Sequence, residues 1–457
     1  MRTTWMVRRR QVLGAGLPAA GGVLALACRG AQPGAGPGEA KLGANPATIT
    51  YAGWGTPREI ESVESEIAAF SKKHADLKIT VKQEVVPWNG YHEKLQVQAA
   101  GGALPDIMLV SSAFFQNLAL LQAFLGVGRY FARDKLRWDE FTPGAKDFLT
   151  IDGKLYGMPA GGFGVGGAMV TLNKAVFQTT SAALPDFTWT WDDLLARARQ
   201  ITQAGGGEQG PWGVDFGKST WEAVWEWHLR AYGGSVWNDE RTASTVDTEA
   251  AKQTFQFVKD LVDRWNVSHP QPGDPAFDAG QVGMSIAWSG KASTRMSQGV
   301  VPVGVATMPR GSAGHGLGRP TGKSHVYTVG ATTKEPEAAW RYVKFLVTER
   351  EAEQARALSA VAKPGYRPLI EVYFAKIPAH LQEWAKVGQF YIDHTPSYAP
   401  LPPAVATRVL PSYDDQMAII SEQLQRFYAG EISVVECVNQ MKRLLDARLR
   451  EVQAAAK

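Results

Sequence analysis

The chain has 457 residues, a formal net charge of +4 and only two cysteines. Four arginines at the N-terminus, at positions 2, 8, 9 and 10, account for the whole of that charge, so the rest of the chain is neutral and lacks the basic excess of a nucleic-acid-binding protein. The eight histidines are scattered and neither HExxH nor CxxC occurs, so we expect no metal and no cofactor.

The first 27 residues have the pattern of an export signal. The arginines precede an apolar run over 12–27 that, at roughly sixteen residues, is short for a membrane-spanning helix of about 20. Arg9 and Arg10, followed after one residue by a hydrophobic pair, resemble the twin-arginine signal. We therefore predict that residues 1–27 are a removable export signal, and that the protein works outside the cytoplasmic membrane, at the cell surface or in the periplasm.

Cys28 comes directly after this run. The preceding residues 24–27 resemble a bacterial lipobox, in which the cysteine becomes the lipidated first residue, although Ala25 stands where that pattern prefers leucine. The same letters also fit the Ala-x-Ala site of an ordinary signal peptidase. Both processing routes stay open, and a lipid anchor on Cys28 is favoured because a cysteine follows the cut.

Residues 28–47 are mostly glycine, alanine and proline, which cannot bury a core. A flexible tether of this length reaches roughly 25 Å, enough to hold a folded unit off a membrane. With Cys28 used as the anchor, Cys437 has no disulfide partner and is expected to be a buried thiol.

From residue 48 the pattern alternates strands and amphipathic helices. Residues 48–54 are strand-like, apolar residues at helical spacing follow from Ile60 to Phe70, and 77–81 alternate again. The short apolar run 107–110 is typical of a strand that is covered on both faces. The predicted class is α/β, and about 430 residues after the leader predict at least two lobes.

The middle of the chain contains helices with readable starts. Thr190, Trp191, Asp192 and Asp193 form a capping-box pattern, and Asp247 precedes another apolar face at helical spacing. Strand-like alternation returns over 284–288 and 301–305, whereas the last 120 residues or so are mainly helical apart from a proline-rich break at 396–403.

Two stretches match enzyme motifs, but the secondary structure predicted around each match argues against the corresponding enzyme site. Residues 162–167 match GxGxxG, but a strand-like run over 168–172 follows, where a dinucleotide site needs a helix N-terminus. Residues 283–287 approach GxSxG but lack its last glycine and lie in an alternating pattern. We interpret the first as a flexible crossing between lobes and expect no serine nucleophile in the second.

Tryptophan is the unusual feature, with fifteen in the chain. A sugar ring has an apolar C–H face and a polar rim, so a sugar site needs flat aromatic platforms beside hydroxyl, amide and charged groups. Five tryptophans cluster in one stretch, at Trp212, Trp221, Trp225, Trp227 and Trp237, and isolated ones such as Trp54, Trp88 and Trp288 stand at presumed strand ends or in loops. A cleft role and a core role are about equally favoured for Trp54 and Trp288. By contrast, tryptophans at helical spacing are interpreted as packing residues: Trp191, Trp265 and Trp340.

A series of landmarks in a fixed order resembles the family 1 extracellular solute-binding proteins of bacterial ABC importers, the group that includes maltose- and oligosaccharide-binding proteins. The resemblance covers nearly the whole chain after the leader. The landmarks are 49–54, 91–95, 99–107, 152–159, Asn173-Lys174, 187–194, Gly233-Gly234, 280–284, 338–346 and 365–368. Many sugar binders of this family place an acid after the strand ending at Val110, where this chain has Ser111 and Ser112.

The resemblance implies two α/β lobes joined by hinge strands, with a ligand cleft between them. Lobe 1 would comprise 48–158 and 309–368, and lobe 2 would comprise 159–308 and 369–457. The ligand contacts of the family then correspond to Trp54, Ser111, Ser112, Phe163, Trp221, Trp288, Tyr366 and Arg367, and the composition argument adds Trp88.

The sequence thus predicts a lipid-anchored, monomeric, non-enzymatic protein that binds a carbohydrate and delivers it to the permease subunits of an ABC transporter. Three alternatives remain. Arg58, Lys323 or Arg367 could hold the anion of a glycerophosphodiester or another polyol phosphate. Two carboxylates could form the catalytic pair of a glycan hydrolase. A surface adhesin that binds long polymers is the third.

Overall fold

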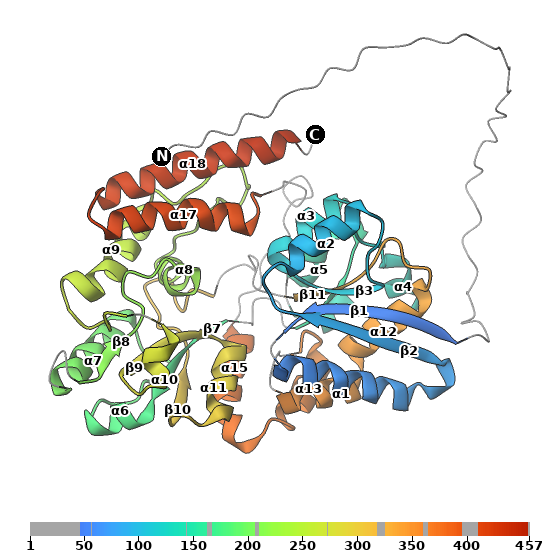
Figure 1. Cartoon of the computed structure of the whole chain (residues 1–457), viewed down its shortest axis with the longest axis horizontal. Helices are drawn as coiled ribbons and strands as arrows, with labels where there is room; N and C mark the ends of the chain where they lie inside the picture. The colour runs from blue at the N-terminus through green and yellow to red at the C-terminus, as the bar shows by residue number, and fades with distance from the viewer. Residues whose placement is uncertain are drawn as a thin grey trace, which may run out of the picture. The chain divides into compact units, whose positions relative to one another are not determined.

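The computed structural model describes residues 46–55, 57–142, 144–161, 167–205, 210–271, 273–317, 325–359, 364–394 and 410–455. The predicted export signal, Cys28 and nearly all of the predicted tether lie outside these ranges, as does Phe163. Strands and helices alternate through the first three quarters of the described chain, and helices dominate the rest (Figure 1). The α/β prediction is confirmed.

The first sheet has the strand order β2-β1-β3-β11-β6, in which β1 runs parallel to β2 and β3, and β11 runs antiparallel to β3 and β6. Its strand β11 comes from far along the chain and completes a sheet that the N-terminal part begins. The strands are β1 Ala47–Trp54, β2 Ile79–Val86, β3 Ile107–Ser111, β6 Met158–Pro159 and β11 His325–Val329.

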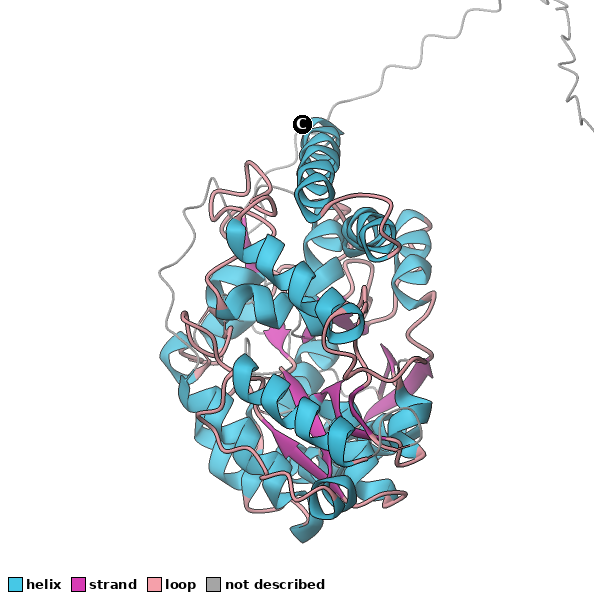
Figure 2. Cartoon of the chain, turned by 90° about the vertical axis from the view of Figure 1, so that its left-hand side faces the viewer, coloured by secondary structure: helices cyan, strands magenta, loops and turns pink. Residues whose placement is uncertain are grey.

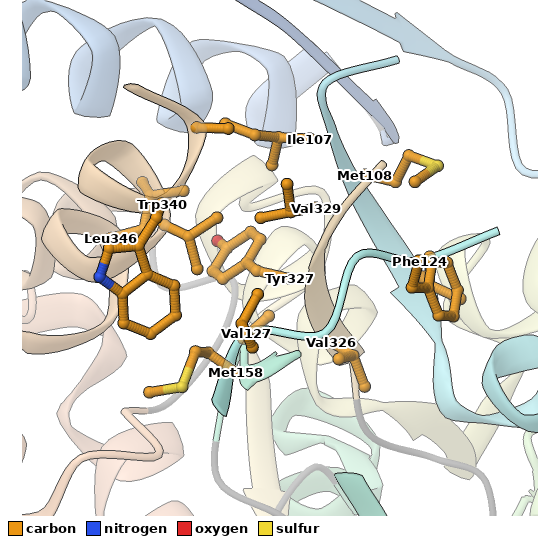
Figure 3. Packing of buried hydrophobic residues seen from close by; sticks show 14 of the residues in the cluster. Ile107, Met108, Phe124, Val127, Met158, Val326, Tyr327, Val329, Trp340 and Leu346 are labelled. Carbon is orange, nitrogen blue, oxygen red and sulfur yellow. The ribbon is translucent and has the colours of Figure 1, made fainter. Parts of the chain in front are cut away.

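Helices pack on this sheet because its strands β3 and β11 are buried along nearly their whole length. Val326, Tyr327 and Val329 of β11 share one buried cluster with Trp340 and Leu346 (Figure 3). The helices and short elements of this part are α1 Pro57–Lys73, η1 Ala75–Leu77, α2 Tyr91–Ala100, α3 Ser112–Leu120, α4 Gly128–Arg133, η2 Trp138–Glu140, α5 Ala145–Leu149, the β4 (Thr150–Ile151) and β5 (Lys154–Leu155) pair, α12 Pro336–Thr348 and α13 Arg350–Ser359.

The second sheet has the order β10-β7-β9-β8, with β7 antiparallel to β9 and β10, and β8 parallel to β9. All six residues of β7 are buried, so this sheet too is covered on both faces. Its strands are β7 Ala168–Asn173, β8 Trp212–Val214, β9 Val282–Trp288 and β10 Val303–Ala306. Because a strand follows residues 162–167, the described backbone has no helix where a dinucleotide fingerprint would need one.

The helices around the second sheet begin where the sequence indicates. Thr190 caps α7 through the predicted capping box, in which the Thr190 hydroxyl accepts from the Asp193 N–H and the Asp193 carboxylate accepts from the Thr190 N–H. Thr248, one residue after Asp247, caps α9. These helices are α6 Lys174–Thr179, α7 Trp191–Ala204, α8 Glu222–Ala231, α9 Glu249–Asp263, α10 Asp274–Asp278 and α11 Ser289–Gln298.

The C-terminal quarter adds helices to the second sheet and its cluster. Helices α17 and α18 pack along each other, and α18 also packs on α9 (Figure 1). In the view of Figure 2 the strands lie among surrounding helices. The C-terminal elements are η4 Arg367–Leu369, α14 Ile370–Phe374, η5 Ala379–Leu381, α15 Gln382–His394, α17 Tyr413–Tyr428 and α18 Val434–Ala455.

Each sheet has its own hydrophobic core, so the prediction of two lobes is confirmed. Trp191 and Trp340 are fully buried, as expected for packing residues, and Trp265 packs against the edge of the second core. Cys437 is buried in that core as predicted, and burial raises the pKa of its thiol to about 12. A thiol of that pKa is unreactive at neutral pH.

A buried ion cluster joins the two helices that flank the first sheet. The Arg356 guanidinium of α13 donates to Glu66 of α1 at 2.9 Å and to Glu353 at 2.6 Å, and it also donates to the Leu346 carbonyl at 2.9 Å. All three charged side chains are at most 4% exposed. Removing the arginine would leave two carboxyl groups in the interior without their cation.

We predict that Arg356→Ala lowers the free energy of unfolding by about 3–5 kcal/mol, because it breaks a buried ion network. Urea unfolding monitored by tryptophan fluorescence would measure this loss. Arg350→Ala, at the exposed start of the same helix, is the matched control and should stay within about 0.5 kcal/mol of the wild type. Equal effects of the two substitutions would contradict the role given to the cluster.

Burial also sets the pH dependence of this cluster. Burial raises the pKa of Glu353 to about 7 from an ordinary value of 4.5, and it raises the pKa of Glu66 as well. The folded protein therefore binds more protons than the unfolded chain between these values, so stability falls as pH rises from about 4.5 to about 7. In Glu353→Gln the fall should be smaller, whereas the exposed control Glu431→Gln should keep the wild-type profile. Urea unfolding at pH 5 and pH 8 tests this, and a wild-type profile in Glu353→Gln would contradict it.

Candidate functional site

Three of the predicted site residues stand at the carboxyl ends of strands. Trp54 ends β1, Ser111 ends the neighbouring β3, and Trp288 ends β9 in the second sheet. In open α/β sheets, ligands bind in the crevice outside these strand ends. Ser111 also caps α3, because its hydroxyl accepts from the Ala113 N–H at 3.3 Å.

Trp54 lies in an aromatic cluster at the edge of the first sheet. Its ring centroid is 5.0 Å from Trp88, 5.1 Å from His92 and 4.9 Å from His325. The Ser111 N–H donates to Nε2 of His92 at 3.2 Å. Burial lowers the pKa of His92 to about 3 and that of His325 to about 4, so both rings are neutral at physiological pH.

The second lobe contributes a pair of tryptophans. Trp221 and Trp288 meet edge to face, with their ring centroids 5.9 Å apart. Trp221 is 36% exposed and immediately precedes α8, while Trp288 immediately precedes α11. Sequence-distant residues thus form one aromatic surface at the strand ends of the second lobe.

A cavity of about 430 Å³ is lined by residues of both lobes. Its lining combines aromatic rings with carboxylates, amides and guanidinium groups, which is the composition of a small-molecule site. Helices α3 and α5 contribute from the first lobe, and α8, the segment 233–241 and α17 contribute from the second. The aromatic members are Phe115, Phe148, Trp225, Trp237 and Tyr413, and the polar side chains include Ser112, Gln116, Asn117, Asp147, Glu222, Glu226, Arg230, Asp239, Arg241 and Gln416.

The acidic groups of the cavity are held by neighbours. Glu222, in the first turn of α8, is only 6% exposed. Burial and the carboxylate of Glu222 together raise the pKa of Tyr413, whose hydroxyl bonds that carboxylate. One turn further along α8, Glu226 accepts from the Arg230 guanidinium at 2.5 Å.

A tight turn carries Trp237, Asp239 and Arg241 to the cavity. The Asn238 side-chain oxygen accepts from the backbone N–H groups of residues 242 and 243, at 2.8 and 3.1 Å. Arg241 has a φ of 55°, which is uncommon for a residue with a side chain and is kept where the surroundings fix it. Trp237 is fixed too, because its indole N–H donates to the Gln416 side-chain oxygen at 2.8 Å.

One hydrogen bond of this turn spans the two lobes. The Arg241 guanidinium donates to the side-chain oxygen of Gln116, on α3, at 3.3 Å. Both residues line the cavity. The cavity is therefore closed on this side by a direct contact between a residue of each lobe.

The predicted site residues fall into three groups. Ser112 lines the cavity, and Trp221 directly precedes the lining residue Glu222. Trp54, Trp88, Ser111 and Trp288 form the aromatic surfaces at the strand ends. Tyr366 packs on Phe141, with its hydroxyl 3.3 Å from a Glu140 carboxylate oxygen, and Arg367 is exposed.

Several cavity residues were not singled out from the sequence. Trp225 and Trp237 belong to the tryptophan-rich stretch, but nothing distinguishes them there from packing residues. Glu222 and Tyr413 are brought together only by the fold. The signals that the sequence did offer were an acid directly after Trp221 and the Asn238-Asp239 pair, which is typical of a turn.

Neither of the two described basic residues considered for a phosphodiester, Arg58 and Arg367, lines the cavity. Arg58 donates instead to α11, to the Ser297 hydroxyl at 2.6 Å and the Ser293 carbonyl at 3.3 Å. Arg367 is not a lining residue, and Lys323 lies outside the described ranges. Within the described chain, no three His, Cys, Asp or Glu side chains gather as metal ligands would, and no helix is long and apolar enough to cross a membrane.

Comparison with known families gives one match of wide coverage. A profile of the family described as bacterial extracellular solute-binding protein matches residues 55–353. A binding protein of Brucella abortus (strain 2308) is 25% identical over 376 residues, which cover 77% of this chain and 82% of that protein.

Solved structures of the same architecture cover most of this chain. The ABC substrate-binding protein from Listeria monocytogenes, in complex with cycloalternan, is similar with a TM-score of 0.70 and 18% identity over 90% of this chain and 100% of that one. The GacH receptor of Streptomyces glaucescens, solved without ligand and with acarbose, is similar with a TM-score of 0.69 and 21% identity over 89% of this chain and 99% of that one. At these identities the likeness establishes the fold, including the two lobes.

Proposed function

Because the chain belongs to the bacterial extracellular solute-binding protein family, we propose that it captures a mono- or oligosaccharide between its two lobes and delivers it to the permease of an ABC importer. The observation that carries this proposal is the cavity of about 430 Å³, lined from both lobes by aromatic rings beside carboxylates, amides and guanidinium groups. Two solved relatives of the same fold were crystallised with the glycans or glycan mimics cycloalternan and acarbose.

Sugar recognition fits the chemistry of this lining. Trp237 offers a flat apolar surface to the C–H face of a sugar ring, and Ser112, Gln116 and the carboxylates offer partners to its hydroxyl rim. A hydroxyl that is buried without a partner would cost about 1–3 kcal/mol, so this polar lining also discriminates between isomers.

The proposed role requires that the ligand is bound and released without a chemical reaction. A ligand that touches both lobes binds the closed arrangement better than the open one, and this difference in affinity drives closure. The Arg241 to Gln116 hydrogen bond is a contact that opening of the lobes would break. Capture, closure and release need no catalytic step, and we propose that the protein is not an enzyme and acts as a monomer.

For the ligand contacts, we propose Ser112, Trp221 and Trp288 together with the cavity residues Trp225 and Trp237. Trp54, Trp88 and Ser111 would form the neighbouring wall of the first lobe. The assignments of Phe163, Tyr366 and Arg367 to the site remain predictions from the family resemblance.

The lobe boundaries are part of the same proposal. Lobe 1 is assigned to 48–158 and 309–368, and lobe 2 to 159–308 and 369–457. The division is supported by the sheets, since β1, β2, β3, β6 and the late strand β11 form the first and β7 to β10 form the second. The crossings between lobes would act as the hinge.

Binding should be seen by calorimetry against a panel of neutral trisaccharides, with maltotriose, cellotriose, arabinotriose and galactotriose as members. We predict that Trp237→Ala weakens binding of the best member by about 2 kcal/mol, roughly thirtyfold, because it removes an aromatic platform that lines the cavity. Trp265→Ala, away from the cavity in the same lobe, should leave affinity unchanged. Hydrolysis of the glycan, or failure of every member to bind, would refute the proposed function.

We also propose export through residues 1–27, lipidation at Cys28 and a tether over 28–47 that holds the lobes near the permease. Cys28→Ser should move the protein from the membrane fraction to the soluble extracytoplasmic fraction, while glycan affinity stays the same. Fractionation and immunoblotting would measure this. A Cys28→Ser protein that stays in the membrane fraction would remove the lipid anchor and leave the binding role intact.

A further inference from the structure

Arg58 connects the two lobes outside the lining of the cavity. It stands in the first turn of α1, four residues after the end of β1 at Trp54, and α1 packs on β2 and α13 of the first lobe. Its guanidinium donates to the Ser297 hydroxyl at 2.6 Å and to the Ser293 carbonyl at 3.3 Å, both on α11. Helix α11 packs on β7, β9 and β10 of the second sheet, so both hydrogen bonds cross from one lobe to the other.

The two acceptors on α11 are arranged for this donor. Ser293 and Ser297 lie about one helical turn apart, and the Ser297 hydroxyl donates to the Ser293 carbonyl at 2.9 Å. The Ser297 oxygen is thereby left to accept from Arg58. Nε2 of His380 lies 3.1 Å from the same hydroxyl and helps to hold it. The planar guanidinium of Arg58 can bond both acceptors at once, and its charge makes each bond stronger than a bond between neutral groups.

Separation of the lobes would break both of these bonds, because Arg58 moves with α1 and its acceptors move with α11. Burial lowers the pKa of the Arg58 guanidinium, which still carries its charge at every physiological pH. The Arg241 to Gln116 bond joins the lobes at a second place, beside the cavity. Side-chain hydrogen bonds therefore hold the lobes together at two separate points.

We infer that Arg58 is a latch that stabilises the closed arrangement of the lobes and thereby raises the affinity for the glycan. The part that concerns affinity rests on the proposed function, whereas the part that concerns closure does not. A ligand that binds the closed arrangement has an apparent Kd equal to its intrinsic Kd divided by the closed fraction. A contact that raises the closed fraction therefore tightens binding, and Arg58 acts as a positioning residue.

The first test measures closure without any ligand. Pulsed EPR reports the distance between the lobes from spin labels at two introduced cysteines, Lys82→Cys on β2 and Gln253→Cys on α9, where both native side chains are exposed. Cys437 is buried, and a Cys28→Ser background removes the other native thiol. Arg58→Met keeps the length of the side chain but not its donors. In this variant the ratio of short to long distances should fall by about threefold or more.

The second test is a double-mutant cycle on affinity. Calorimetry with the tightest-binding trisaccharide of the panel compares Arg58→Met, Ser297→Ala and the double variant. Each single substitution should raise Kd by about threefold or more. Because both remove the same hydrogen bond, the double variant should bind about as well as Arg58→Met alone, and its loss should not equal the product of the two single losses.

Arg341→Met is the matched control, because Arg341, on α12 of the same lobe, donates to Glu337 of its own helix at 3.1 Å. It should leave both the distances and Kd at their wild-type values. Equal distance distributions in the wild type and Arg58→Met overturn the latch, and so do independent effects of Arg58→Met and Ser297→Ala in the cycle. Absence of binding by every trisaccharide overturns the proposed function, and the ligand-free distances still decide whether Arg58 is a latch.

Discussion

The architecture follows from the covering of both sheets by helices. All residues of β7 are buried, as are all but one residue each of β3 and β9, so the central strands of the two sheets have no face left for a ligand. The strand ends are what remain, and there the backbone changes from strand to helix within one or two residues. Ser111 and Trp288 occupy these transitions in the two lobes. Polar and aromatic side chains can stand there without disturbing a core.

The cavity itself is lined mainly by helix and turn residues of both lobes. Two of its acids are fixed in place, because Glu222 is held by Tyr413 and Glu226 by Arg230. Fixed carboxylates can bind sugar hydroxyls without first losing side-chain freedom, which favours both affinity and discrimination. The turn over 237–241 has the same property, since its backbone is fixed by Asn238 and its indole by Gln416.

The sequence predicted the local structure well where local interactions decide it. The capping box at Thr190 and the apolar run 107–110 depend on neighbours in sequence, and both are present in the structure. The α/β class and the two lobes followed from the alternating pattern and the chain length, together with the family resemblance. The site was harder to predict from the sequence. Glu222 and Tyr413 are far apart in the chain and meet only through the fold. A buried tryptophan such as Trp225 has the same local sequence pattern whether or not one edge faces a cavity.

The central claim is that one ligand is held by both lobes in the cavity that α3, α5, α8, the segment 233–241 and α17 line. A crystal structure of the mature protein with the tightest-binding trisaccharide tests it most directly. The account predicts a sugar ring against Trp237, with hydrogen bonds to Ser112 or Gln116 of the first lobe and to Glu222 of the second. A trisaccharide bound elsewhere, or in contact with one lobe alone, would contradict it.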